Sequence, residues 1–174
     1  MKKQKGFSLI ELLIVVAIIL IIAAIAIPNL LRSKMAANEA SAVGSVRTIN
    51  TAQVTYSSAW GVGYGAALSN LGDGGVTPCA ASSTTACLID GVLAAGTKSG
   101  YTFAAAGTLA TNGVNNGFEV NATPAAVGTT GQRAFCSDQT GVIRFQVSGA
   151  AVGVGQGNCA AIATAAGVSG PLGN

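Results

Sequence analysis

The feature that most constrains this chain is an unbroken apolar run near its start. Residues 7–27 read FSLIELLIVVAIILIIAAIAI, with one charged residue, Glu11, and one hydroxyl residue, Ser8. As a helix, this run is roughly 32 Å long and matches a hydrocarbon core of about 30 Å. Three of the first five residues are lysines. They predict that the N-terminus stays in the cytoplasm and that the remainder lies outside.

A secretory signal peptide is one interpretation of this segment, because 24–26 reads Ala-Ile-Ala and offers a cleavage site with small residues. A plain signal anchor is another. The apolar run is longer than the usual signal-peptide core of about 7–15 residues. Glu11 also counts against both interpretations, because a carboxylate in a membrane segment is costly and is by default functional.

The string KGFSLIELL at residues 5–13 resembles the class III signal of type IV prepilins and pseudopilins. The resemblance implies cleavage between Gly6 and Phe7 by a prepilin peptidase, which also N-methylates the new terminus at Phe7. It places Glu11 at the fifth position of the mature chain, which is glutamate in that family. Pro28 falls where the family often has a helix-kinking proline. Leu20 departs from the family, which often has glycine there.

The chemistry of Glu11 agrees with this resemblance. A buried carboxylate needs a cationic partner, and the apolar run contains none. The amine freed at Phe7 is cationic, and methylation leaves it so. We therefore expect Glu11 to set the axial register between neighbouring subunits by meeting a neighbour's Phe7 amine.

An amphipathic helix is expected at residues 29–60, where Val43, Val46, Ile49, Tyr56 and Trp60 recur at helical steps. Glycines at 61, 63 and 65 predict its end, and Gln53 interrupts the apolar stripe. A single helix over 8–59 would be roughly 78 Å long. Two helices joined at Pro28 are the alternative.

The remainder, 61–174, predicts a small antiparallel sheet. Strands are expected at 99–105, 117–123, 133–137 and 142–147, and the Asp138-Gln-Thr-Gly141 string predicts a type I turn in a hairpin. The Gly- and Ala-rich tail from Ser148 is expected to be coil that wraps back. The predicted fold class is α+β: a long N-terminal helix, first apolar and then amphipathic, packed on this sheet.

Four cysteines, Cys79, Cys87, Cys136 and Cys159, follow the apolar run. No two form a C-x-x-C pair, which argues against zinc. In an oxidising compartment they predict two disulfides with three possible connectivities. The pairs Cys79–Cys87 and Cys136–Cys159 are favoured because each closes a local loop.

Catalytic chemistry finds little support. The chain has no histidine, which excludes Ser-His-Asp and Cys-His groups. Two Gly-rich strings, at 61–66 and 91–99, fit nucleotide-binding loops poorly and are better interpreted as turns. We expect no enzyme activity, cofactor or metal. Charge and stacking from Arg133 and Arg144, with Phe135 and Phe145, would suit single-stranded nucleic acid, although such hairpin arginines are more often simply solvated.

The sequence thus predicts a type IV pilin, a structural subunit of a surface filament serving adhesion, motility or DNA uptake. It predicts a leader (1–6), a membrane and filament-core helix (7–28), an amphipathic helix (29–60) and a head (61–174). The expected partners are further copies of the chain, the peptidase and methyltransferase, an assembly platform, a separate motor ATPase and the lipid bilayer. The chain would begin in the inner membrane and end in an extracellular pilus.

Two alternatives stay open. The first is a type II secretion pseudopilin, although the tail from Ser148 lacks the acidic calcium-binding loop usual in the major secretion subunit. The second is a secreted or membrane-anchored binding module with a conventional signal peptide, cleaved after Ala26.

Overall fold

The computed structural model describes residues 7–76, 78–155, 157–162 and 169–172, and its contacts divide the chain into two compact units, 1–34 and 35–174. Helix α1 (Leu9–Trp60) runs through both units as one element and contains Pro28. The single long helix of the sequence prediction is therefore confirmed, and the alternative of two helices joined at Pro28 is wrong.

The C-terminal end of α1 is set by glycine. Gly61 has a positive φ of 64° and donates its N–H to the carbonyl of Ser57 at 3.1 Å. Glycine adopts this left-handed conformation without the steric cost that other residues incur, so it commonly terminates helices. The chain then turns through Gly65 into the head.

Gln53 interrupts the apolar stripe of α1. Its side chain is fully buried, and both polar atoms of its amide group form hydrogen bonds with the backbone of Gly65. Its Oε1 accepts the Gly65 N–H at 2.8 Å, and its Nε2 donates to the Gly65 carbonyl at 3.3 Å. This pair fixes the loop after α1 and leaves no buried amide atom of Gln53 unpaired.

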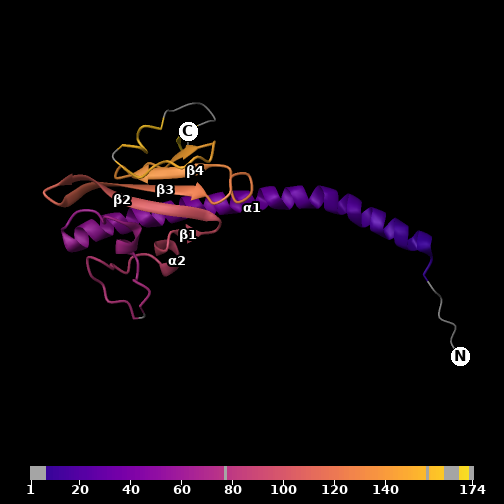
Figure 1. The fold of residues 1–174 in the computed structure, drawn as a ribbon, viewed down its shortest axis with the longest axis horizontal. Coiled ribbons are helices and arrows are strands. Elements are labelled where there is room, and N and C mark those ends of the chain that lie inside the picture. Colours follow the sequence, from indigo (N-terminus) through magenta and orange to yellow (C-terminus); the bar gives the residue numbers. More distant parts are fainter. Residues whose placement is uncertain (1–6, 77, 156, 163–168, 173–174) are drawn as a thin grey trace. The chain divides into compact units, whose positions relative to one another are not determined.

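Among its described residues, the head contains a six-stranded antiparallel sheet in which the strands follow one another in chain order. Figure 1 shows β2, β3 and β4 side by side. The strands are β1 (Thr97–Lys98), β2 (Tyr101–Thr111), β3 (Val114–Pro124), β4 (Ala134–Asp138), β5 (Arg144–Gln146) and β6 (Ser169–Pro171). A 3₁₀ helix, η1 (Leu68–Leu71), and a short helix, α2 (Gly91–Ala94), precede them.

Two tight turns frame β2. Ser99-Gly100 joins β1 to β2 and Asn112-Gly113 joins β2 to β3, and all four residues have positive φ. Positive φ at both central residues is the type I′ arrangement that suits the twist of a hairpin, and Asn-Gly is its preferred sequence. The strand expected at 117–123 lies within β3. The strand expected at 99–105 begins two residues too early, because β2 starts at Tyr101.

The hairpin predicted at 138–141 is confirmed. Strands β4 and β5 pair antiparallel, and Gly141 donates its N–H to the Asp138 carbonyl at 2.9 Å. The Asp138 carboxylate also accepts the Thr140 N–H at 2.9 Å. The tail, expected to be coil, has only the short strand β6 among its described residues.

The hydrophobic core of the head lies between α1 and one face of the sheet. Helix residues Ala42, Val46, Ile49 and Tyr56 belong to the same buried cluster as sheet residues of β2, β3 and β4. The largest buried sheet side chains in that cluster are Tyr101, Phe118 and Phe135. Along β3, Phe118, Val120 and Ala122 belong to this core. Because side chains alternate along a strand, Glu119 and Asn121 lie on the opposite face.

We predict that Phe118→Ala lowers the free energy of unfolding by about 3–5 kcal/mol, because it removes a large side chain that is only 1% exposed. Urea titration of the full chain in detergent, followed by aromatic fluorescence, would measure this loss. Val92→Ala is the control, because Val92 is 60% exposed and its change should stay within about 0.5 kcal/mol. Equal losses in both variants would contradict the placement of the core.

Candidate functional site

The N-terminus of α1 is closed by two of its own side chains. The carboxylate of Glu11 accepts the N–H of Ser8 at 2.9 Å, and the hydroxyl of Ser8 accepts the N–H of Ile10 at 3.4 Å. Because α1 begins at Leu9, Ser8 lies at the N-cap and Glu11 at the third helical position. The Glu11 contact is that of a Ser-x-x-Glu capping box, whereas the Ser8 hydroxyl binds the second helical N–H instead of the third. Both contacts satisfy N–H groups that have no partner within the helix.

The first unit, considered alone, exposes an apolar surface. Large apolar side chains from Phe7, which is 86% exposed, to Leu31, which is 51% exposed, have no protein contact that buries them. The most apolar stretch of α1 is long enough to cross a membrane, and none of that stretch is buried. Apolar helix surface of this extent requires a lipid or protein environment.

The structure places the residues expected for processing and assembly as follows. Phe7 lies just before α1, and Glu11 and Pro28 lie within it. Gly6 lies outside the described residues. Among those described, the ion pairs join Lys98 to Asp90 and Arg133 to Glu39, so neither includes Glu11. The role of Glu11 between subunits therefore stays a prediction.

A buried carboxylate that the sequence analysis missed joins α1 to the head. Glu39, 8% exposed, accepts the N–H groups of Gln132 at 2.8 Å and Arg133 at 3.1 Å. Arg133 also binds it through Nε and Nη2, each at 2.8 Å. We call Glu39 and Arg133 the helix clamp. The two residues are 94 positions apart, and no local pattern marks such a pair.

The clamp changes the ionisation of its members. Burial alone raises the pKa of Glu39, but the N–H groups of Gln132 and Arg133 and the Arg133 guanidinium outweigh burial and lower that pKa below 4.5. Burial, together with the Glu39 charge, raises the pKa of Tyr101 far above 10.0. Tyr101 therefore stays a neutral donor, and it binds the Arg133 carbonyl at 2.8 Å.

Gly131 makes room for this arrangement. A Cβ atom at position 131 would collide with the hydroxyl group of Tyr101. The loop before β4 can therefore approach Tyr101 only because residue 131 has no side chain.

The two disulfides join Cys79 to Cys87 and Cys136 to Cys159, which are the pairs favoured from the sequence. The first closes a loop between η1 and α2. The second joins β4 to the tail and forms a small apolar cluster with Val152. For a head with so many glycines, each cross-link contributes about 2–4 kcal/mol by restricting the unfolded chain.

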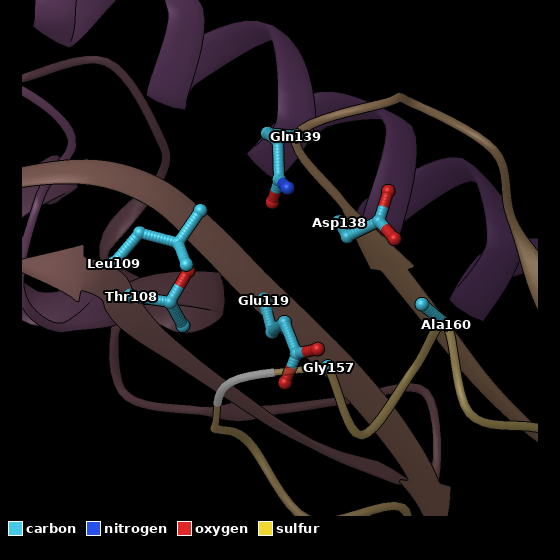
Figure 2. A pocket seen from close by; sticks show the side chains of 7 residues that line it. All are labelled: Thr108, Leu109, Glu119, Asp138, Gln139, Gly157 and Ala160. Atoms are coloured by element: carbon cyan, nitrogen blue, oxygen red, sulfur yellow. The ribbon is translucent and has the colours of Figure 1, made fainter.

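A cavity of about 280 Å³ lies on the sheet face opposite α1 (Figure 2). Glu119 on β3 and Asp138 on β4 stand directly opposite each other in the strand register and both line it. Thr108, Leu109, Gln139, Gly157 and Ala160 complete the lining. No group of three or more acidic, histidine or cysteine side chains is placed to hold a metal in the part of the chain that the structure describes.

The residues weighed for nucleic-acid contact are largely engaged inside the head. Phe135 is fully buried, and the Arg133 guanidinium lies 5.5 Å and 5.7 Å from the ring centres of Phe135 and Phe145. Arg133 is also bound to Glu39. Phe135 therefore offers no exposed ring on which a base would stack, and this part of the sequence expectation is wrong.

Comparison with known proteins identifies the class to which the N-terminal segment belongs. Residues 1–27 match the family model for the prokaryotic N-terminal methylation motif. The chain thus carries the signal of prepilin-like proteins, as its sequence predicts.

Two type IV pilins are similar to part of the chain. The chain is 62% identical over 39 residues to the type IV wide pilus major component PilA4 of Thermus thermophilus, covering 22% of this chain and 30% of that protein. It is 45% identical over 54 residues to the type IV major pilin protein PilA of Myxococcus xanthus, covering 31% of this chain and 24% of that protein. The matches thus span less than a third of either relative. No solved structure matches the chain.

We predict that Glu39→Gln destabilises the head in a pH-dependent way. Because the folded-state pKa of Glu39 lies below 4.5, its ionised form stabilises the fold above that pH, and this contribution is lost as pH falls through the folded pKa. The difference in free energy of unfolding between wild type and Glu39→Gln, about 1–3 kcal/mol at pH 7, should therefore shrink below pH 4.5.

Urea titrations of both chains from pH 7 to pH 3 would measure this difference. Lys98→Gln is the control, because it breaks a more exposed ion pair with Asp90 that should contribute about 0–1 kcal/mol. A constant difference between wild type and Glu39→Gln across the range would contradict a stabilising charge at Glu39.

Proposed function

We propose that the chain is the structural subunit of a type IV pilus filament. One observation carries this proposal: a capped helix begins directly after the predicted cleavage position and exposes an unbroken apolar surface around a single carboxylate, Glu11. Such a surface suits the bilayer before assembly and the packed centre of a helical filament afterwards. The similarity of the chain to two major pilins, over 39 and 54 residues, supports it.

The proposed division of the chain follows this role. Residues 1–6 form the leader, 7–28 the membrane and filament-core helix, 29–60 the amphipathic helix, and 61–174 the head. The chain enters the inner membrane as a single-pass prepilin and is then displayed outside the cell. A prepilin peptidase, an assembly platform and a separate motor ATPase act on it, and further copies of the chain are its principal partners.

The proposed part of Glu11 follows from charge burial. Within one chain its carboxylate accepts the N–H of Ser8. No cation among the described residues forms an ion pair with it. The methylated amine of Phe7 in a neighbouring copy supplies that cation when the helices pack together. Removing one member of such a pair leaves the other charge buried and unpaired, which is strongly destabilising.

The first test is the intact mass and the N-terminal peptide of the mature protein. A chain that starts at N-methylated Phe7 is expected. A chain that starts at Ile27 would remove the apolar helix together with Glu11, and would favour the secreted binding module instead.

We predict that Glu11→Ala still inserts into the membrane but abolishes filaments, because the Phe7 amine of a neighbour then lacks its partner. Electron microscopy of sheared surface material and membrane fractionation would measure the two properties. Ile10→Ala is the matched control, because it shortens a neighbouring side chain without removing charge, and it should retain filaments. Normal filaments from Glu11→Ala would contradict the proposal that Glu11 sets the axial register between neighbouring subunits.

Whether the filament is a long pilus or a short secretion pseudopilus would be decided by the same images. Long surface fibres are the expected result. Fibres confined to the periplasm would assign the chain to a secretion system.

A further inference from the structure

The outer face of the sheet is covered by the tail, and polar side chains of β3 hold it there. Asn121, 8% exposed, donates to the carbonyl of Val152. Glu119, 2% exposed, lies two residues earlier on the same face. The tail residues from 152 to 155 and from 157 to 162 are thus held against β3 from one side.

The carboxylate of Glu119 accepts hydrogen bonds from two backbone N–H groups of this tail. One oxygen accepts the N–H of Gly155 at 2.7 Å and the other accepts the N–H of Cys159 at 3.1 Å. Glu119 belongs to neither ion pair formed among the described residues. A carboxylate buried without a cation is costly unless N–H donors replace its water. These two N–H groups supply that replacement, so the tail and Glu119 stabilise each other.

One of these two N–H groups belongs to a disulfide cysteine. Cys159 is bonded to Cys136 on β4, and Cys136 pairs in register with Asn121 of β3. Glu119 therefore holds the backbone of Cys159 next to the strand that carries its partner sulfur. The two cysteines are 23 positions apart, so closing this loop costs more chain entropy than closing the shorter loop of the other pair.

We propose that Glu119 is a positioning residue for the Cys136–Cys159 disulfide. Its carboxylate binds the tail of the reduced chain and raises the effective concentration of one thiol at the other. In the oxidation, the S–S bond forms as both thiols lose their protons, and the two electrons reduce the disulfide of an external oxidant to two thiols.

This role would favour one disulfide connectivity over the others. Four cysteines allow three connectivities. Cys79 and Cys87 are only 8 positions apart and need little help to meet. The longer pair gains most from a contact formed before oxidation. Linkage makes the effect reciprocal, because the closed disulfide must strengthen the Glu119 contact as much as the contact favours the disulfide.

The experiment equilibrates the full-length chain, in detergent, with mixtures of reduced and oxidised glutathione. Free thiols are then alkylated, and each disulfide is quantified separately by peptide mass spectrometry. Because each protein disulfide that forms releases two glutathione thiols, the square of the reduced-glutathione concentration divided by the oxidised-glutathione concentration, at half reduction, gives the effective concentration of each thiol pair. Cys79–Cys87 is an internal reference within the same molecule.

The test variant is Glu119→Gln, which keeps the size of the side chain and removes its charge. The matched control is Asp138→Asn, because Asp138 lines the same cavity but binds Thr140 instead of the tail.

Glu119→Gln should lower the effective concentration of the Cys136–Cys159 pair about tenfold, since it weakens two charge-assisted hydrogen bonds. The Cys79–Cys87 value and the Asp138→Asn chain should match wild type. An unchanged Cys136–Cys159 value in Glu119→Gln would overturn the proposal. So would an equal loss in both disulfides, or an equal loss in Asp138→Asn, because each would indicate an effect on the whole fold or on cavity charge. The result does not depend on filament assembly, so this proposal and the proposed function stand or fail separately.

Discussion

Backbone N–H groups without a helix or strand partner are the constraint on which this structure depends, and carboxylates satisfy them throughout. The chain has six acidic residues, and each accepts at least one backbone N–H. Glu11 and Asp90 cap the N-termini of α1 and α2, and Asp73 and Asp138 stabilise turns. Glu39 and Glu119 each bind two N–H groups of a distant segment. The few acidic side chains of this chain therefore serve mainly as hydrogen-bond acceptors for backbone N–H groups.

The same constraint explains how one helix serves two environments. A helix satisfies its internal N–H and C=O groups wherever it lies, so the sequence needs only to change its side chains along α1. Its first unit presents apolar side chains on every side, whereas the second buries one stripe that includes Val46 and Ile49 against the sheet. The polar exception in that stripe, Gln53, again satisfies backbone, at Gly65. The apolar segment and the amphipathic segment thus belong to one continuous helix.

Sequence reasoning succeeded where the signal is local. The apolar run predicts the first half of α1, and Asp138 predicts the turn of the β4–β5 hairpin. The short spacing of Cys79 and Cys87 predicts their disulfide. In each case the residues that carry the signal are those that form the structure. Asn112-Gly113 was a local signal too, and it was overlooked although Asn-Gly strongly favours a hairpin turn. The helix clamp and the hold of Glu119 on Cys159 join residues far apart in the chain. Their partners follow from the packed sheet, so no periodicity or spacing reveals them.

The order of the strands also bears on how the head forms. Each described strand pairs with its neighbour in the chain, so most of the sheet arises by closing short loops, which costs little entropy. Topologies with such local pairing fold faster than those that must join distant segments. The β2–β3 hairpin, whose two strands are joined by a tight turn, can therefore form before the residues that follow β4 are in place. Residues after Ser148 then add β6 to the edge of the sheet and lie against its outer face.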